Sequence, residues 1–394
     1  MNICITNTRE FNPQIGGVEK VSCLLAQAFM EKGHRVIFLS GIQERDYEDE
    51  DVKSYFFPDS QSVSSARNIA YVADLINRLQ IDVVLNQAAN IASFSDLWNK
   101  VKNITDIKLI SVIHFSPDYA IRATQSNFFI APVLGYNPVK WGRNLLMWFR
   151  FHLYRKKQMM KELKNYYRSL EHLSDAVVLL SSSYRSFIHK IVGSDEKLRV
   201  IPNPVESKIS DVNLNEKRNQ ILYLGRLEYG LKRVDRLIPI WKKLSKEFPS
   251  WEFIIVGDGH IRTEAENMVN QQNIERIHFA GFQNPEEYLK NTSILSLVST
   301  NEGFPMVLIE AQQYGCVPIA YNSFSALADI IDDGVNGYAV TPFSEQEYIS
   351  RLRLLMEDAP KRRHMAEAGI KTCRKFDVHN IAEQWEELFT YLNE

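Results

Sequence analysis

Short apolar runs alternate with longer amphipathic stretches along this sequence, and the alternation starts twice. In the first half, apolar runs that predict buried strands lie at 2–7, 35–40, 54–58, 81–87, 108–114 and 175–181. Helical patterns lie between several of them, as at 17–31 and 66–79. Strands that alternate with helices predict an α/β fold with a mostly parallel sheet covered by helices on both faces.

The same pattern begins again after Pro202-Asn203-Pro204, which we interpret as a linker. Strands are predicted at 220–226, 252–257, 277–282, 294–300 and 316–321, with helices at 234–248, 261–271, 285–291 and 306–314. A chain of 394 residues suits two such domains. We therefore predict doubly wound domains at 1–203 and 204–377, with ligands at the carboxyl ends of the strands. A last helix at 378–394 is expected to pack back on the first domain.

Composition excludes several classes of protein. The net charge of −2 gives no overall field that would attract nucleic acid. The four cysteines lie far apart and form no CxxC pair, so neither a zinc site nor a disulfide framework is predicted. The sequence starts with an apolar strand pattern instead of a secretory signal, and no run of eighteen apolar residues occurs. We expect a cytoplasmic protein.

Residues 115–167 break the alternation because they contain no clear strand. Within them, 140–164 mixes aromatic side chains with bases, as in Trp141, Trp148, Arg150 and Arg155. An amphipathic helix of this composition can lie at the surface of a bilayer, here the inner face of the membrane. A helical insertion with solvated bases and a protein-binding segment remain as alternatives.

The segment Glu302-Gly303-Phe304-Pro305-Met306 follows the predicted strand 294–300 and opens a helix. A helix that starts at the carboxyl end of a strand offers unpaired N–H groups and a positive dipole to an anion. Glu310 lies just over two turns further on. Two carboxylates beside an anion site can accept hydrogen bonds from the hydroxyls of a sugar and a ribose. The alternative is that both are solvated acids.

Cations and glycines follow the two strands before that segment. Arg226 belongs to the Gly-Arg-Leu tripeptide at the carboxyl end of the predicted strand 220–226. Lys232 stands just before the next predicted helix. Fixed cations at this edge can neutralise a diphosphate, as magnesium does elsewhere. Gly257 ends the next strand, where a missing side chain lets backbone approach a ligand. Each of these residues alone could be an ordinary surface or loop residue.

The first half supplies two more candidates. Gly16 and Gly17 follow the first strand and open the first helix, so their backbone N–H groups could approach a phosphate or an acceptor. A flexible loop is the alternative. His114 ends strand 108–114, where its side chain would face the cleft between the domains, unless it is an ordinary buried histidine.

Taken in order, Gly-Arg-Leu, Lys, Val-Gly-Asp-Gly, Gly-Phe and Glu-Gly-Phe-Pro with the second Glu resemble the retaining glycosyltransferases of group 1, or family 4. The resemblance implies the GT-B fold, in which two Rossmann-like domains face a central cleft. It implies that Arg226 and Lys232 hold the donor diphosphate, that Glu302 contacts the transferred sugar, and that Glu310 contacts the ribose. Backbone amides of Gly303, Phe304 and Met306 would line the sugar and phosphate, and His114 would lie close to them.

One departure from the family pattern affects Lys232. Four residues, 228–231, separate Gly-Arg-Leu from the lysine, where the family usually has three. A longer variant that ends in Lys-Arg-Val-Asp-Arg-Leu also occurs in the family, so the resemblance still points to Lys232.

Together these features predict a retaining, metal-independent glycosyltransferase. Its donor would be a nucleotide-diphosphate sugar and its acceptor a glycan or a lipid-linked glycan, with no further cofactor and a role in surface polysaccharide biosynthesis. The main alternative is a nucleotide-sugar isomerase or hydrolase on the same fold. A binding protein without catalysis is a second alternative. A nicotinamide-dependent oxidoreductase would need GxGxxG after the first strand, and residues 7–20 lack it.

Overall fold

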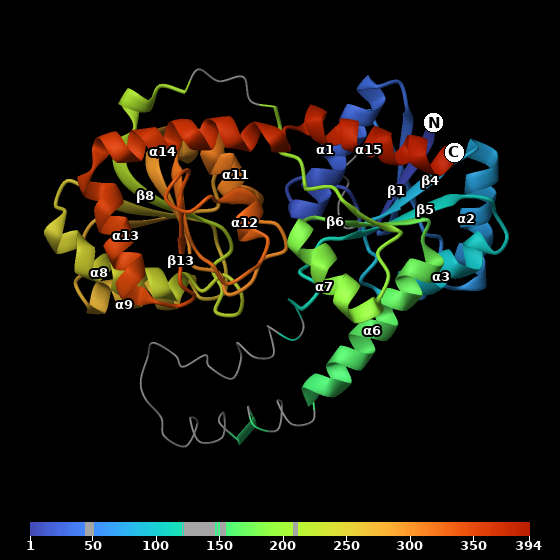
Figure 1. Cartoon of the computed structure of the whole chain (residues 1–394), viewed down its shortest axis with the longest axis horizontal. Coiled ribbons are helices and arrows are strands. Elements are labelled where there is room, and N and C mark those ends of the chain that lie inside the picture. The colour runs from blue at the N-terminus through green and yellow to red at the C-terminus, as the bar shows by residue number, and fades with distance from the viewer. Residues whose placement is uncertain (44–50, 120, 122–145, 148, 150–154, 208–211) are drawn as a thin grey trace. The chain divides into compact units, whose positions relative to one another are not determined.

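A computed structural model describes residues 1–43, 51–119, 121, 146–147, 149, 155–207 and 212–394. They form two compact units (Figure 1). The first unit comprises Met1–Pro117, Met159–Ser207 and Phe376–Glu394, and the second is built on Lys208–Lys375. Each unit holds one parallel sheet with helices packed against it, so the prediction of two Rossmann-like α/β domains is confirmed.

The first unit contains a seven-stranded sheet in the order β3-β2-β1-β4-β5-β6-β7. Its strands are β1 (Asn2–Arg9), β2 (Arg35–Ile42), β3 (Lys53–Phe56), β4 (Val83–Asn86), β5 (Lys108–Ile113), β6 (Ala176–Leu179) and β7 (Leu198–Val200). The helices of this unit are α1 (Gly17–Glu31), α2 (Ala66–Leu79), α3 (Ala92–Lys102), α6 (Lys156–Leu173), α7 (Ser182–Val192) and α15 (Val378–Asn393). The strand order reverses between β1 and β4, the topology of a doubly wound sheet.

The C-terminal helix α15 belongs to the first unit. It packs beside α1, as Figure 1 shows, with the rings of Phe29 and Trp385 centred 6.2 Å apart. His34 Nε2 lies 2.8 Å from Glu386 Oε1. Just before α15, the backbone N–H of Val205 donates to Phe376, and the N–H of Val378 donates back to Val205. The chain therefore leaves the first unit after 207 and returns to it at 376.

The second unit contains a six-stranded sheet in the order β10-β9-β8-β11-β12-β13. Its strands are β8 (Arg218–Leu224), β9 (Glu252–Val256), β10 (Ile277–Gly281), β11 (Thr292–Leu297), β12 (Val317–Tyr321) and β13 (Tyr338–Val340). The α-helices of this unit are α8 (Leu237–Glu247), α9 (Arg262–Gln271), α10 (Pro285–Asn291), α11 (Met306–Gln313), α12 (Leu327–Ile330), α13 (Glu345–Glu357) and α14 (Ala359–Thr372). The strand order reverses between β8 and β11.

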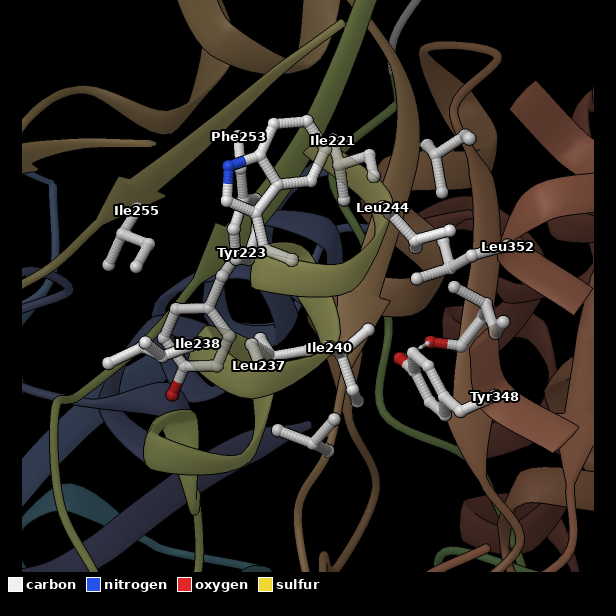
Figure 2. Close-up of a cluster of buried hydrophobic side chains, with 14 of the residues drawn as sticks. Ile221, Tyr223, Leu237, Ile238, Ile240, Leu244, Phe253, Ile255, Tyr348 and Leu352 are labelled. Carbon is white, nitrogen blue, oxygen red and sulfur yellow. Dashed lines mark hydrogen bonds between the residues drawn. The ribbon is translucent and has the colours of Figure 1, made fainter. Parts of the chain in front are cut away.

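One apolar core holds the sheet of the second unit to its helices. Figure 2 shows Ile221 and Tyr223 of β8 and Phe253 of β9 in one cluster with Leu244 of α8. Tyr348 reaches this core from α13, and its hydroxyl lies 2.7 Å from Ser296 Oγ of β11. Burying an aromatic or aliphatic side chain of this size contributes roughly 1.5–3 kcal/mol. This packing fixes β8 and β11, whose ends carry the candidate site residues.

Some elements differ from those expected from the sequence. β7 and β13 were not predicted because each has three residues, too few for a periodic pattern, and each lies at a sheet edge. β11 ends at Leu297, three residues earlier than expected, which leaves Val298–Asn301 as a buried loop. Of the predicted insertion 115–167, residues 156–167 belong to α6, and 120, 122–145, 148 and 150–154 lie outside the described residues.

Candidate active site

In the second unit, the predicted residues lie where the strand order reverses. Gly225 and Arg226 follow β8, and Glu302 lies on the loop that follows β11, its neighbour in the sheet. In open α/β sheets, the carboxyl ends of the strands at such a reversal form the usual ligand site. The topology therefore brings together two segments about seventy residues apart in the sequence.

The structure pairs Lys232 directly with Glu302. Lys232 Nζ donates to Glu302 Oε1 at 2.7 Å, and the two side chains are 27% and 11% exposed. Ser299 Oγ donates to the same oxygen at 2.6 Å. From the sequence, we expected Lys232 to bind the donor diphosphate and Glu302 to bind the transferred sugar, each as a separate group. Because they share a contact, a change at either residue also alters the charge and orientation of the other.

Backbone hydrogen bonds join the two loops that carry this pair. The N–H of Thr300 donates to the carbonyl of Leu231 at 2.7 Å, one residue before Lys232. Ser323, in the loop after β12, donates to the carbonyl of Ser299 at 2.6 Å. These contacts hold the loops after β8, β11 and β12 together and restrict how Lys232 and Glu302 can move. Such fixed groups can stabilise developing charge without reorganisation during the reaction.

A buried ion pair follows Lys232 and was not predicted from the sequence. The guanidinium of Arg233 donates to both carboxylate oxygens of Asp235, at 2.9 Å and 2.8 Å, and both side chains are 3% exposed. Arg233 has φ 49°, in the left-handed region, and its N–H donates to the carbonyl of Glu228 at 3.0 Å. This turn closes the loop 228–231, which has four residues where the family usually has three. It places Lys232 beside Glu302.

Arg226 has a fixed backbone and an extended side chain. The hydroxyl of Tyr223 donates to the carbonyl of Arg226 at 2.9 Å. Burial, followed by the charge of Glu302, raises the pKa of Tyr223, so its phenol stays protonated and can donate this bond. The Arg226 side chain is 71% exposed and lies 3.9 Å from the Glu228 carboxylate, a weak contact. Its charge is therefore available to an anionic ligand at the end of β8.

Gly257 supports the same turn through the protein's own backbone. It has φ 132°, and a Cβ built on it would collide with the carbonyl oxygen of Gly225. A Cβ built on Gly259 would likewise collide with the carbonyl oxygen of Leu227. The close approach predicted at Gly257 is thus made to the Gly225–Leu227 backbone, and a side chain there would displace the turn that holds Arg226.

Helix α11 begins at Met306, with Pro305 as its N-cap and no side-chain hydrogen bond at that cap. Gly303 and the buried Phe304 form the turn before it, and Glu310 lies in the helix, half-buried. Backbone N–H groups in the first turn of a helix have no intrahelical acceptor. The anion-binding role of Gly303, Phe304 and Met306 stays a prediction.

In the first unit, His114 follows β5 and is buried. Its Nε2 lies 2.6 Å from Oε1 of Gln87, which follows β4. Burial lowers the pKa of His114 to about 4, so the ring is neutral near pH 7. The sequence did not single out Gln87, although its position one residue after β4 is the signal that could have found it.

The N-terminus of α1 already carries a carboxylate. Gly16 is its N-cap, and a Cβ there would lie 2.6 Å from Glu19 Oε2. Asn7 Nδ2 donates to the other oxygen of Glu19 at 2.9 Å, and Glu19 is buried. A carboxylate at a helix N-terminus interacts favourably with the helix dipole and repels a second anion. Of the two ligands expected at Gly16 and Gly17, an acceptor hydroxyl fits this site better than a phosphate.

Two protein-family models match the chain, one for each unit. Residues 205–372 match the model described as "Glycosyl transferases group 1", and residues 15–208 match the model described as "Glycosyltransferase Family 4". The chain belongs to the group 1 glycosyltransferases. The family predicted from the motifs around Arg226 and Glu302 is thus confirmed.

Among curated members of this family, the chain is 31% identical over 176 residues to an amylovoran biosynthesis glycosyltransferase of Erwinia amylovora, covering 44% of this chain and 48% of the relative. It is 30% identical over 200 residues to a lipopolysaccharide 1,6-galactosyltransferase of Salmonella typhimurium, covering 48% and 55%. The chain spans about half the length of the curated relatives it matches.

Solved structures agree over nearly the whole chain. The apo form of the lipopolysaccharide outer core galactosyltransferase WaaB matches with a TM-score of 0.72 at 20% identity, covering 99% of this chain and 100% of that chain. Anabaena HepE, solved with UDP and glucose, matches with a TM-score of 0.73 at 17% identity and the same coverage. Likeness at this identity shows the fold, and the predicted GT-B fold is confirmed. In the described part of this family member, no helix is both long and apolar enough to cross a bilayer.

Proposed function

We propose that this protein is a retaining, metal-independent glycosyltransferase. It would transfer a sugar from a nucleotide-diphosphate sugar to a glycan or lipid-linked acceptor during surface polysaccharide biosynthesis, in the cytoplasm. The observation that carries the proposal is the Lys232–Glu302 pair, 2.7 Å apart at the reversal of strand order, with Arg226 at the end of the neighbouring strand. The names of the curated relatives, which include amylovoran and lipopolysaccharide enzymes, support the class of product.

In this proposal, the positive charges of Arg226 and Lys232 stabilise the departing nucleoside diphosphate. The bond between the sugar's anomeric carbon and the phosphate oxygen breaks, and the acceptor oxygen bonds to that carbon on the same face. The departing phosphate takes the acceptor's proton, so no protein base is required. Fixed cations that stabilise the leaving group typically contribute about 3–4 kcal/mol each.

Carboxylates and backbone amides would orient the donor. Glu302, held by Lys232 and Ser299, would accept hydrogen bonds from hydroxyls of the transferred sugar. Glu310 would accept from the ribose, and the amides of Gly303, Phe304 and Met306 would bind sugar and phosphate oxygens. From the first unit, His114 would contribute a neutral, fixed ring, and Gly16 and Gly17 would contact the acceptor.

The proposal is tested by incubating the purified protein with a panel of sugar nucleotides and candidate acceptors, with and without EDTA. Transfer should require the acceptor, continue in EDTA, and give a product with the anomeric configuration of the donor, as read by NMR. Donor conversion without acceptor would instead indicate an isomerase or hydrolase. Complete loss of transfer in EDTA that manganese restores would contradict metal independence.

The two glutamates should give different kinetic defects. Glu302→Ala should lower kcat more than it raises KM, because sugar orientation matters most in the transition state and Lys232 loses its partner. Glu310→Ala should mainly raise the donor KM and weaken inhibition by the free nucleoside diphosphate. Glu302→Gln, which keeps an acceptor oxygen, should fall between wild type and Glu302→Ala. Equal defects in the two alanine variants would contradict the assignment of sugar and ribose.

We also propose that segment 140–164 makes a peripheral contact with an anionic membrane. Its described end is the start of α6, where Lys156, Lys157 and Lys161 are exposed. Each well-placed base contributes about 1 kcal/mol at an anionic surface. Co-sedimentation with anionic liposomes should fall as salt rises, since charges are screened over about 10 Å at 0.1 M.

Changing these three lysines to Gln should reduce sedimentation sharply. The matched control changes Lys242, Lys243 and Lys246 of α8 to Gln, which removes the same charge from exposed sites of another helix. No sedimentation of the wild type at low salt, or equal losses in both variants, would contradict a membrane role for this segment.

A further inference from the structure

A small cavity of about 10 Å³ lies inside the first unit, close to His114. Its polar wall comes from the ends of β4 and β5 through Gln87 and His114, from the linker through Asn203, and from helix α15 through Trp385. Apolar side chains, including Val21 and Leu25 of α1, complete its wall. A cavity of this size holds one water molecule when its wall offers two to four polar partners.

The wall offers those partners. Nε2 of Gln87, Nδ1 of His114 and Nε1 of Trp385 are all buried and have no hydrogen-bond partner among the described residues. A buried polar atom left without a partner costs about 1–3 kcal/mol, so natural proteins rarely leave three around one cavity. The amide of Gln87 and the indole of Trp385 donate, which leaves His114 as the group whose role depends on its tautomer.

Gln87 determines that tautomer. Its Oε1 lies 2.6 Å from Nε2 of His114, and a carbonyl oxygen only accepts. The ring proton is therefore on Nε2, and Nδ1 is an acceptor. One water in the cavity could then accept from Gln87 and Trp385 and donate to Nδ1 of His114, which satisfies all three groups.

We propose that Gln87 and Trp385 are positioning residues for His114, and that together they bind one buried water that holds its ring in a single tautomer and orientation. Helix α15 thereby helps to hold His114 in place at the end of β5, although Trp385 is 271 residues from His114 in the sequence (385 − 114). The consequence for catalysis rests on the proposed function, in which His114 takes part as a neutral ring.

The protonation of the two ring nitrogens of His114 is measured by ¹⁵N NMR of histidine-labelled protein. The signals of His114 are assigned as those that are missing in His114→Asn. Wild type should show Nε2 protonated and Nδ1 unprotonated. Gln87→Met removes the acceptor and should give a mixture of tautomers. Gln87→Glu keeps an acceptor and should preserve the tautomer, while its negative charge raises the pKa of His114.

Trp385→Phe removes the indole N–H and should shift the Nδ1 signal. Its matched control is Trp98→Phe, because Trp98 is also fully buried in the first unit with an unpartnered Nε1 but does not line the cavity. That control should leave both His114 nitrogens unchanged. A wild-type ring protonated on Nδ1, or equal effects of the two tryptophan variants, would overturn the inference.

Kinetics separate this inference from the proposed function. Gln87→Met and Trp385→Phe should lower kcat about tenfold, with donor KM nearly unchanged, because misplaced groups affect the transition state most. A changed tautomer with unchanged kcat would remove the positioning role and leave the proposed function standing. If His114→Asn also transfers sugar at the wild-type rate, the role of His114 in the proposed function fails, whatever the NMR shows.

Discussion

Replacing Lys232 by Met should lower kcat by about a hundredfold or more while the protein stays folded. The variant loses positive charge at the departing diphosphate, and it also leaves Glu302 without the ammonium that lies 2.7 Å away. Arg226→Ala should have a similar effect on kcat with less effect on Glu302, because the side chain of Arg226 is 71% exposed and its ion pair is with Glu228, at 3.9 Å.

The matched control is Lys243→Met. Lys243 also lies 2.7 Å from a glutamate, Glu345, but both side chains are largely exposed and neither belongs to the candidate site. An isolated surface pair of this kind contributes less than about 1 kcal/mol to stability. Turnover by this control should equal that of wild type. Near-normal transfer by both Lys232→Met and Arg226→Ala would show that neither cation stabilises the leaving group.

Asp235→Ala should destabilise the second unit by about 3–5 kcal/mol. Both members of the Arg233–Asp235 pair are 3% exposed, so removing the carboxylate leaves a guanidinium buried without a counter-charge. Urea unfolding followed by tryptophan fluorescence would measure the loss, since Trp241 and Trp251 are buried in the core of this unit. Because Arg233 also shapes the turn that carries Lys232, activity should fall even where the variant remains folded.

An exposed pair provides the comparison. Arg353 and Glu247 make two hydrogen bonds of 2.9 Å and 3.0 Å at side chains that are 37% and 45% exposed. Glu247→Ala should leave the free energy of unfolding nearly unchanged, since water solvates the remaining charge. If Asp235→Ala costs no more than this exposed variant, water reaches the Arg233–Asp235 pair and the anchoring of Lys232 is wrong.

The sequence predicted most strands because a strand buried on both faces is a continuous apolar run. β8 and β9 were found in this way, and the helices α1, α2 and α10 were predicted with their observed bounds. The same reasoning failed for β13, a three-residue strand at the sheet edge, because it leaves no periodic signal. Periodicity reports which side chains are buried, and short edge strands bury few.

Contacts within the candidate site were less predictable. Motif order pointed to Lys232 and Glu302, but only the pairing of β8 with β11 shows that they touch. The left-handed Arg233 could not be foreseen, because that conformation is usual for glycine and asparagine and carries no signal at an arginine. The contact between Gln87 and His114 likewise depends on which strands lie side by side.

The return of the chain to the first unit affects how the protein is made on the ribosome. When residues 1–207 have left the ribosome, Phe29 of α1 still lacks the apolar side chains of α15, because 376–394 are translated after 208–375. Residues 208–375, which carry the sheet of the second unit, are translated before α15. The first unit therefore cannot complete its fold until the sheet of the second unit has been synthesised, and until then it exposes an apolar surface that favours aggregation.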